Sequence, residues 1–308
     1  MKYTSLFTVL LVLMTACGWS QNDKQNTKMN KLTDFEEYVI LNKGTERPNT
    51  GLYNNHFEGG TYVCRKCEAP LYNSEDKFES HCGWPSFDDE INGAVKRKTD
   101  ADGRRTEILC ANCDAHLGHV FIGERLTAKN TRHCVNSVSM KFVPSLNGKE
   151  QKVVLAGGDF KGLQFFLAQI PGIVRTKAGF VGTGSEKPTY ESVQSGEGNY
   201  VMAVEILYAP EKIAFDDVIR IFMEVHDPTT PNQQGTDMGS QYRSVIYYNT
   251  EAQKETAQEV IQELEAKDVK VTTTLEELPS FVEAAENYQD YYFRSAEGPK
   301  NHSYTKRF

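Results

Sequence analysis

The segments Cys64-Arg65-Lys66-Cys67 and Cys110-Ala111-Asn112-Cys113 decide the fold of the first half of this 308-residue chain. Each Cys-x-x-Cys pair offers two thiolates at one turn, and 42 residues separate the pairs, as in two knuckles around one tetrahedral Zn²⁺. Short β-like stretches at residues 61–63 and 106–109 precede the pairs. The pattern predicts a structural zinc site in a β domain, with structural disulfides or a redox Cys-x-x-Cys as alternatives.

The distribution of the seven cysteines also divides the chain. Six lie between Cys64 and Cys134, and the last 174 residues contain none. An Asn147-Gly148 turn signal follows the cysteine-containing part. We therefore predict two domains, at residues 34–146 and 151–308, which agrees with the length of the chain.

Composition and charge exclude few functions. With 39% hydrophobic and 25% charged residues, the chain is an ordinary globular protein. The net charge of -8 and the lack of a basic stripe argue against nucleic acid as a partner.

The first 17 residues have the features of an export signal. Lys2 precedes an apolar run at residues 6–14, which is too short to span a bilayer. The run ends at Met14-Thr15-Ala16-Cys17, which resembles a bacterial lipobox, and a polar tether follows at residues 18–33. The interpretation is an exported, periplasmic protein held at a membrane by a lipid anchor only. A buried N-terminal helix and cleavage after Ala16 without lipidation are the alternatives.

Two cysteines, Cys82 and Cys134, remain outside the predicted metal site. Arg132 and His133 precede Cys134, and a neighbouring cation and imidazole favour the thiolate, which is the nucleophilic form of cysteine. The two free cysteines suit an attacking and a resolving thiol. A static disulfide between them is the alternative.

At this point the motifs of the first domain carry a family resemblance. Residues 32–144 resemble methionine sulfoxide reductase B, which reduces the R epimer of methionine sulfoxide. The matching motifs are Tyr53, the two Cys-x-x-Cys pairs, Ala69-Pro70-Leu71, Lys77-Phe78, residues 82–87, residues 114–121, and Cys134 with Asn136-Ser137. The resemblance implies a β-rich fold of two antiparallel sheets, with the zinc remote from the active site.

The resemblance also implies a chemistry. Cys134 would attack the sulfoxide sulfur while His119 protonates the departing oxygen, leaving a sulfenic acid. Cys82 would condense with it to a disulfide, which a thioredoxin-like reductant would reduce. The substrate would be oxidised methionine in proteins or peptides. The remaining implied site residues are Trp84 for the methyl pocket, His116 and Asn136 lining the site, and Arg132 favouring the thiolate.

Some features of this domain depart from the family or permit another interpretation. His133 stands where the family usually has Tyr, and residues 122–131 lack the Gly-Pro and Thr-Gly turns of the family. His116 and His119 lie close to the second Cys-x-x-Cys pair and are alternative metal ligands, although four thiolates already complete a tetrahedral site.

The second domain has the pattern of an α/β sandwich, so the chain as a whole belongs to the α+β class. We predict a strand at residues 152–156, a helix at 159–170, a helix at 251–266 and a strand at 269–274. Thr250 and Gln253 form the pattern of a capping box at the start of the later helix.

This half resembles methionine sulfoxide reductase A, the family for the S epimer, and fusions of the two reductases are a known arrangement. The matching segments are Ala156-Gly157-Gly158 and residues 188–193, 203–205, 226–229 and 234–244. Asp159 replaces the family's nucleophilic cysteine, Lys161 its tryptophan, Met202 its acidic residue and Tyr200 a histidine. The resemblance therefore implies an inactive site, whose residues are Asp159, Phe160, Tyr190, Asp237 and Tyr242.

Two roles are open for such an inactive domain. It could present oxidised proteins or a redox donor to the first domain, or it could be a scaffold that stabilises the first domain. For the whole chain, the rival hypothesis is a non-enzymatic exported binding protein stapled by zinc or disulfides. The accessibility of the Cys82 and Cys134 thiols discriminates between the enzyme and this rival.

Overall fold

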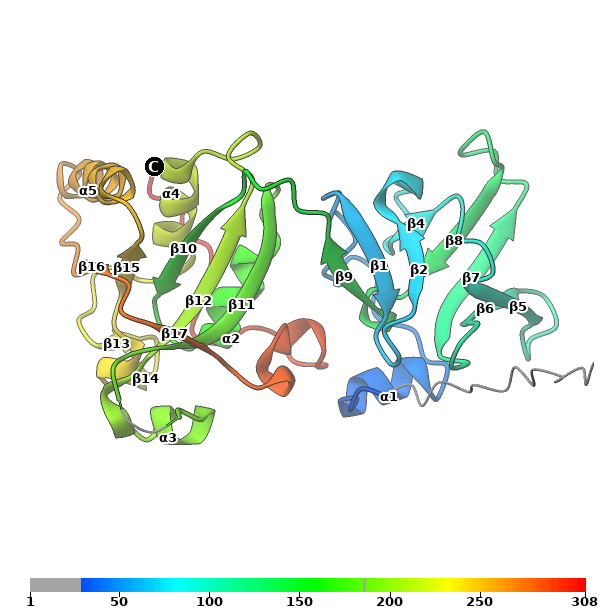
Figure 1. Ribbon diagram of the computed structural model, residues 1–308, viewed down its shortest axis with the longest axis horizontal. Coiled ribbons are helices and arrows are strands. Elements are labelled where there is room, and N and C mark those ends of the chain that lie inside the picture. The colour runs from blue at the N-terminus through cyan, green and yellow to red at the C-terminus, as the bar shows by residue number, and fades with distance from the viewer. Residues whose placement is uncertain (1–28, 185–186) are drawn as a thin grey trace, which may run out of the picture.

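A computed structural model describes residues 29–184 and 187–308 of the protein and places them in two domains (Figure 1). The expected signal sequence, the lipobox-like Cys17 and residues 18–28 of the tether lie outside the described residues. Within the described ranges, no helix combines the length and the apolar character that crossing a membrane requires.

The first domain is built from two antiparallel sheets, as the family resemblance implies. It begins with α1 (Asp34–Ile40), which Thr33 and Glu36 cap in a capping box. One sheet has the order β2-β1-β9 and the other the order β3-β4-β8-β7-β6-β5. The strands are β1 (Gly60–Cys64), β2 (Pro70–Asn73), β3 (Lys77–Phe78), β4 (Ser86–Phe87), β5 (Val95–Thr99), β6 (Thr106–Cys110), β7 (His116–Ile122), β8 (Thr131–Val135) and β9 (Met140–Pro144).

Aromatic side chains fill the space between the two sheets. Tyr62 of β1 and Tyr72 of β2 contact Phe87 of β4, with ring centroids 5.1 and 4.4 Å apart. All three residues are fully buried. This core fixes the strands that carry the site, because β4 and β8 pair directly with each other.

The second domain has a six-stranded mixed sheet of order β16-β15-β10-β12-β11-β17. Its strands are β10 (Gln151–Ala156), β11 (Ile173–Val181), β12 (Val201–Tyr208), β15 (Val245–Tyr248), β16 (Thr274–Glu277) and β17 (Phe281–Glu283). Helices α2 (Phe160–Leu167), α4 (Phe215–Val225) and α5 (Glu251–Glu265) contribute to one core with one face of the sheet. The smaller elements are α3 (Tyr190–Gln194), β13 (Gln233–Gln234), β14 (Asp237–Met238), η3 (Glu197–Asn199), η4 (Ser240–Tyr242), η5 (Glu286–Tyr288) and η6 (Tyr291–Phe293).

Two expectations for this domain need correction. The last parallel strand is β16 at Thr274–Glu277, not residues 269–274, because pairing with β15 begins only at Thr274. Val269 and Val271 instead pack against the helical core before the chain joins the sheet. Gln253 does not complete a capping box with Thr250, because its side chain accepts from the backbone N–H of Asn249 at 2.9 Å.

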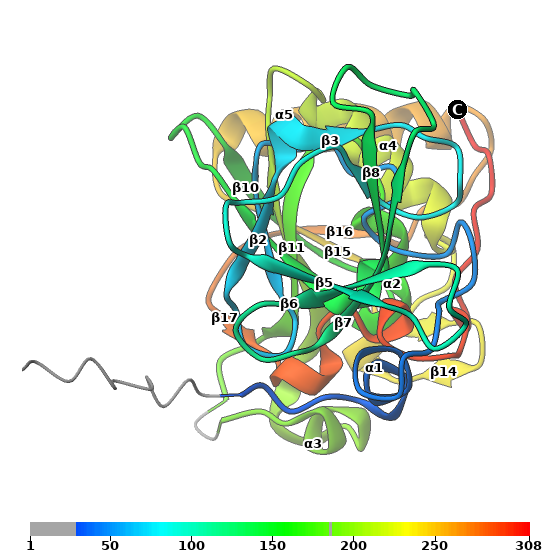
Figure 2. The same cartoon turned by 90° about the vertical axis from the view of Figure 1, so that its right-hand side faces the viewer.

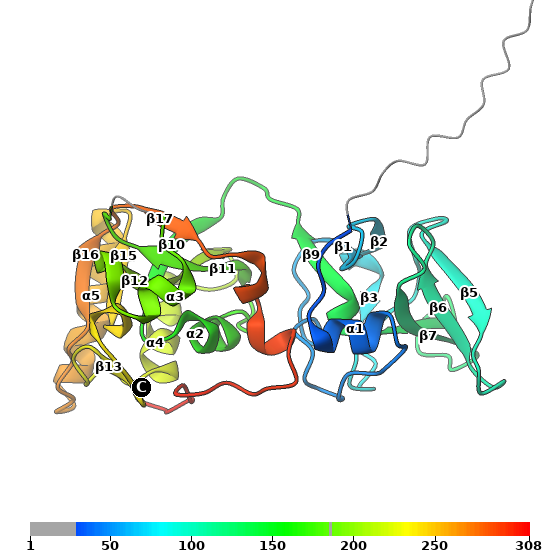
Figure 3. The same cartoon turned by 90° about the horizontal axis from the view of Figure 1, so that it is seen from below.

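A buried ion cluster joins the two domains. The segment of η5 and η6 lies between α2 and α1 (Figures 1 and 3), and Figure 2 shows it beside α1 from the end of the molecule. Arg294, which follows η6, donates to both carboxylate oxygens of Glu36 in α1 at 2.7 and 3.2 Å. Arg65 lies 3.3 Å from the same carboxylate, and all three side chains are buried. The second domain thus supplies a charged partner for a buried carboxylate of the first domain.

Candidate active site and metal centre

The Cys82 and Cys134 thiols face each other in the first domain. Their sulfur atoms lie 3.7 Å apart, and both side chains are half-buried. Cys134 sits on β8 in the middle of the sheet, where it pairs with Ser86 of β4 on one side and with His119 of β7 on the other. The pairing of the strands therefore places Ser86 and His119 on either side of Cys134, and the loop before β4 brings the Cys82 thiol to the Cys134 sulfur.

The contact between the sulfurs changes the acidity of both thiols. A hydrogen bond from Cys134 lowers the pKa of Cys82 to about 4, although burial opposes the shift. The hydroxyl of Ser80, 3.0 Å from the Cys82 sulfur, and that of Ser86 add to this effect. The same contact and burial raise the pKa of Cys134. The two thiols thus act as one unit that holds a single thiolate and shares the remaining proton.

Arg132 supplies positive charge to this unit. It lies two residues before Cys134 on β8, so both side chains point to the same face of the sheet. The positive charge of the guanidinium acts against the rise in the pKa of Cys134 that contact with Cys82 and burial cause. A cation held beside the sulfur lowers the energy of a Cys134 thiolate once contact with Cys82 is interrupted.

The prediction that the His133 imidazole favours the Cys134 thiolate is wrong. His133 points to the opposite face of β8, where it is fully buried and lies 3.1 Å from both the Tyr72 hydroxyl and the Glu90 carboxylate. Burial lowers the pKa of His133 to about 4, so the ring is neutral near pH 7. Its side chain belongs to the core between the sheets.

Two histidines of β7 each have a carboxylate partner. His119 Nε2 lies 2.7 Å from Asp100, and hydrogen bonding to this histidine lowers the pKa of Asp100. His116 Nδ1 lies 2.8 Å from the buried carboxylate of Glu107. Burial lowers the pKa of His116, and its Nε2 is buried without a hydrogen-bond partner among the described residues. Neither ring belongs to the metal-binding cluster of the described chain.

Trp84 and Asn136 are anchored through one loop. The Trp84 indole N–H donates to the backbone oxygen of Glu46 at 3.1 Å, and Asn136 Oδ1 accepts from the backbone N–H of Glu46 at 3.1 Å. The Asn136 amide also donates to the Leu117 carbonyl. The side chain of Asn136 thus holds strands and loop in place. The Glu46 carboxylate accepts from the backbone N–H of Ser137, and burial raises its pKa to about 7.

Several residues of this site escaped prediction. They are Ser80, Ser86, Asp100, Glu107 and Glu124, each of which contacts a predicted residue. A short polar side chain in a turn or strand is an ordinary surface feature, so only the pairing of strands reveals its partner. Ser86 was within reach, because it lies inside the quoted motif at residues 82–87.

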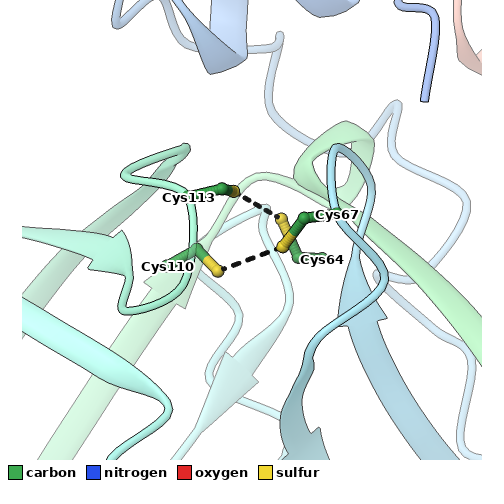
Figure 4. A group of neighbouring side chains, drawn as sticks. All are labelled: Cys64, Cys67, Cys110 and Cys113. Carbon is green, nitrogen blue, oxygen red and sulfur yellow. Dashed lines mark hydrogen bonds between the residues drawn. The ribbon is translucent and has the colours of Figure 1, made fainter. Parts of the chain in front are cut away.

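The four remaining cysteines form one cluster at the edge of the first domain (Figure 4). Cys64 and Cys113, and likewise Cys67 and Cys110, have sulfurs 3.7 Å apart, and all four sulfurs lie within 4.8 Å of one another. A tetrahedral Zn²⁺ with bonds of about 2.3 Å places sulfurs about 3.8 Å apart, whereas a disulfide needs about 2.05 Å. The buried cluster therefore fits a structural zinc site.

The corresponding site of the second domain is occupied by its own side chains. Asp159 caps α2 by accepting from the Lys161 N–H at 2.8 Å. The Tyr190 hydroxyl donates to Asp159 at 2.6 Å, and Lys161 Nζ donates to that hydroxyl at 2.8 Å. Phe160 is fully buried against the Tyr190 ring. Burial raises the pKa values of Tyr190 and Tyr242; the charge of Asp159 adds to the rise at Tyr190, and that of Asp237 adds to the rise at Tyr242.

A pair of facing thiols beside a guanidinium, on a β domain with a four-cysteine cluster, defines a thiol-dependent oxidoreductase. The SelR domain model matches residues 32–144, and the peptide methionine sulfoxide reductase model matches residues 151–307. The chain belongs to the peptide methionine sulfoxide reductases, as a fusion of a B-type first domain with an A-type second domain.

Two curated relatives agree with the B-type assignment of the first domain. Peptide methionine sulfoxide reductase B2, chloroplastic, of Arabidopsis thaliana is 48% identical over 44% of this chain and 67% of that protein. Peptide methionine sulfoxide reductase B5 of the same plant is 54% identical over 36% of this chain and 81% of that protein. The solved structure of reduced Mxr1 from Saccharomyces cerevisiae is 26% identical, with a TM-score of 0.49, over 52% of this chain and 94% of that chain.

Proposed function

We propose that the first domain reduces methionine-R-sulfoxide in proteins or peptides, with Cys134 as the nucleophile and Cys82 as the resolving thiol. The observation that carries the proposal is the 3.7 Å contact between the two sulfurs, beside Arg132 and opposite His119. The enzyme requires at least one of the two thiols to be accessible, and the half-buried state of both is compatible with that requirement.

The chemistry proceeds in two steps. The Cys134 thiolate attacks the sulfoxide sulfur, its oxygen takes a proton, and methionine leaves while Cys134 becomes a sulfenic acid. The Cys82 sulfur then attacks the Cys134 sulfur, and the hydroxyl departs as water. The sulfurs must approach from 3.7 Å to about 2.05 Å, a movement that side-chain rotation supplies. An external dithiol of the thioredoxin class reduces the disulfide.

The two histidines suit different parts of this reaction. His119, held through Nε2 by Asp100, keeps Nδ1 for the substrate, and in its doubly protonated form it is the proposed donor of the Nδ1 proton to the departing oxygen. His116 faces a carboxylate through Nδ1, which favours the proton on that nitrogen. Its buried Nε2 is then an acceptor without a partner among the described residues, suited to a bound water or substrate donor.

We propose a structural role for zinc. Cys64, Cys67, Cys110 and Cys113 would hold the ion, which would supply a fixed link between the segments that follow β1 and β6. Treatment with a thiol-displacing reagent should release one zinc per chain and unfold the first domain, as read by circular dichroism. Release of no zinc, with folding intact, contradicts this role.

The second domain, in this proposal, does not catalyse. No cysteine exists after Cys134 in the sequence, and the Lys161 ammonium lies where the family resemblance puts the methyl pocket. Lys161 is held 4.2 Å above the Tyr190 ring and hydrogen-bonded to its hydroxyl. The buried contact of Glu36 with Arg294 supports a scaffold role for this domain.

The proposed location remains the periplasmic side of a membrane, through lipidation at Cys17. Radiolabelled palmitate should enter the full-length chain expressed in bacteria and not its Cys17→Ser variant. Equal labelling of the two proteins, or none in either, overturns the anchor.

The proposed activity is tested by epimer-resolved reduction of methionine sulfoxide in a blocked peptide, with dithiothreitol as donor, on protein without residues 1–17. The expected result is consumption of the R epimer alone. Consumption of both epimers contradicts an inactive second domain. Consumption of neither overturns the activity and leaves the binding-protein hypothesis in front.

A further inference from the structure

The loop between β7 and β8, residues 123–130, is attached to the rest of the domain by charged contacts. Lys129 lies 2.8 Å from Asp76, 3.1 Å from Asp88 and 3.2 Å from Asp89. The backbone N–H of Arg125 donates to the Asn130 side chain at 2.8 Å, which closes the loop on itself. The loop therefore has a defined conformation beside the strand that carries Cys134.

Glu124 of this loop grips Arg132 with both carboxylate oxygens. Arg132 Nε donates to Oε2 at 2.7 Å, and Nη2 donates to Oε1 at 2.9 Å. Such a two-point contact fixes the plane of a guanidinium, which a single contact does not. The Phe121 ring also contacts this guanidinium, and its centroid lies 4.5 Å from the Arg132 Cζ atom.

The fixed guanidinium is the group that bears on the nucleophile. Arg132 and Cys134 are two residues apart on β8 and so share one face of the sheet, and the fork to Glu124 uses Nε and Nη2 and leaves Nη1 free of that contact. We propose that Glu124 is a positioning residue of the reductase, which aims the Arg132 guanidinium at the Cys134 sulfur. The inference rests on the proposed function of Cys134 and extends it to a residue outside the quoted family motifs.

The charge of Glu124 alone would have the opposite effect. A carboxylate near Arg132 partly cancels the positive charge that stabilises a thiolate, so its removal would favour the Cys134 thiolate by charge alone. If Glu124 acts by aiming the guanidinium, its removal disfavours the thiolate, because Arg132 gains freedom to turn away. The sign of the change therefore separates the two effects.

The pH dependence of Cys134 alkylation measures this sign directly. The groups facing Cys134 are Cys82 from the loop before β4, His119 from β7, Arg132 from its own strand, and the Ser86 hydroxyl from β4. A Cys82→Ser background removes the coupled thiol. Iodoacetamide labelling of the Cys134 peptide, followed by mass spectrometry, then reports one sulfur without requiring any turnover.

In that background, Glu124→Gln should raise the midpoint of Cys134 alkylation by about one pH unit. With Cys82 intact, the same substitution should lower kcat at pH 7 about tenfold and change KM less than twofold. Glu124→Asp, which keeps the carboxylate, should recover part of the loss. Arg125→Gln, a change at an exposed neighbour in the same loop, is the matched control and should leave both readouts unchanged.

The decisive comparison repeats Glu124→Gln in an Arg132→Ala background, where it should have no further effect on alkylation or kcat. An unchanged or lowered midpoint, or an equal loss of kcat without Arg132, overturns the proposal. Thermal melts of each variant show whether a loss reflects unfolding. Alkylation reports on Glu124 even if the wild-type protein reduces no sulfoxide, so failure of the proposed function and failure of this inference are distinguishable.

Discussion

The two domains each place one basic side chain near their candidate site, and they hold it in opposite ways. In the first, Arg132 is held by Glu124 at the edge of the site and leaves the Cys134 sulfur half-buried and reactive. In the second, Lys161 lies within the site and contacts Asp159 and Tyr190 directly. In the proposed function, the externally anchored cation would promote a nucleophile, whereas the internally paired one would occupy the space of a substrate.

Substitution of either active-site cysteine should give the largest loss of activity, and it tests whether the first site acts alone. Cys134→Ser should abolish reduction of the R epimer, because a hydroxyl is far less ionised than a thiol. Cys82→Ser should permit one turnover with a thioredoxin-like donor and then stall at the sulfenic acid. Rapid-quench product counting and dimedone labelling measure both outcomes. Full multiple turnover by Cys82→Ser would show that Cys82 is not the obligatory resolving thiol.

The interface tests whether the second domain supports the first. Arg294→Met should lower the free energy of unfolding by about 2–3 kcal/mol, because it removes the hydrogen bonds of Arg294 to the buried Glu36 carboxylate, which keeps Arg65 and the Thr33 N–H as partners. Guanidinium-induced unfolding measures this cost. Lys300→Met, at an exposed pair with Glu297, is the control and should leave the free energy of unfolding nearly unchanged. Equal effects of the two substitutions would contradict a scaffold role.

Glu46 gives the stability of the first domain a pH dependence. Burial raises its folded pKa to about 7, above the ordinary value of 4.5. Its protonated form is therefore favoured by folding, so this stability is present below pH 4.5 and is lost as pH rises through 7. The loss should be on the order of 3 kcal/mol. Glu46→Gln should flatten this part of the stability curve, and an unchanged curve would contradict the shift.

A restored thiol in the second domain should give the smallest effect. Asp159→Cys alone should yield no reduction of the S epimer, because Lys161 still fills the pocket. Asp159→Cys with Lys161→Trp should yield a trace of activity, since Met202 still replaces the family's acidic residue. Chiral chromatography of the remaining sulfoxide measures it. Appreciable activity of the single variant would show that Lys161 does not block the pocket.

Sequence reasoning predicted the elements whose chemistry is local. The two Cys-x-x-Cys pairs predict a metal site because the two cysteines of each pair share one turn. Asp159 predicts the start of a helix because its side chain caps a backbone N–H only two residues away. The partners of Arg132, His116 and His119 could not be predicted in this way. Glu124, Glu107 and Asp100 meet them only through the pairing of strands β5 to β8.

The wrong predictions for the strand at residues 269–274 and for the His133 imidazole have related causes. A run of β-branched residues at 269–274 fits an extended chain equally well in a sheet or beside a helix. Only the register with β15 decides where pairing starts. His133 adjoins Cys134 in sequence, but successive side chains on a strand point to opposite faces of the sheet. The two side chains therefore lie on different sides of β8.

The four-cysteine cluster also has a consequence for how often the two active thiols meet. Cys82 lies on the stretch between Cys67 and Cys110, whose two ends are brought together at the cluster. A closed stretch of chain explores a smaller volume than an open one, so closing it raises the effective concentration of the Cys82 thiol at Cys134. In the proposed mechanism, the four-cysteine cluster, remote from the chemistry, would thereby help a Cys134 sulfenic acid to find Cys82 before water, peroxide or a foreign thiol does.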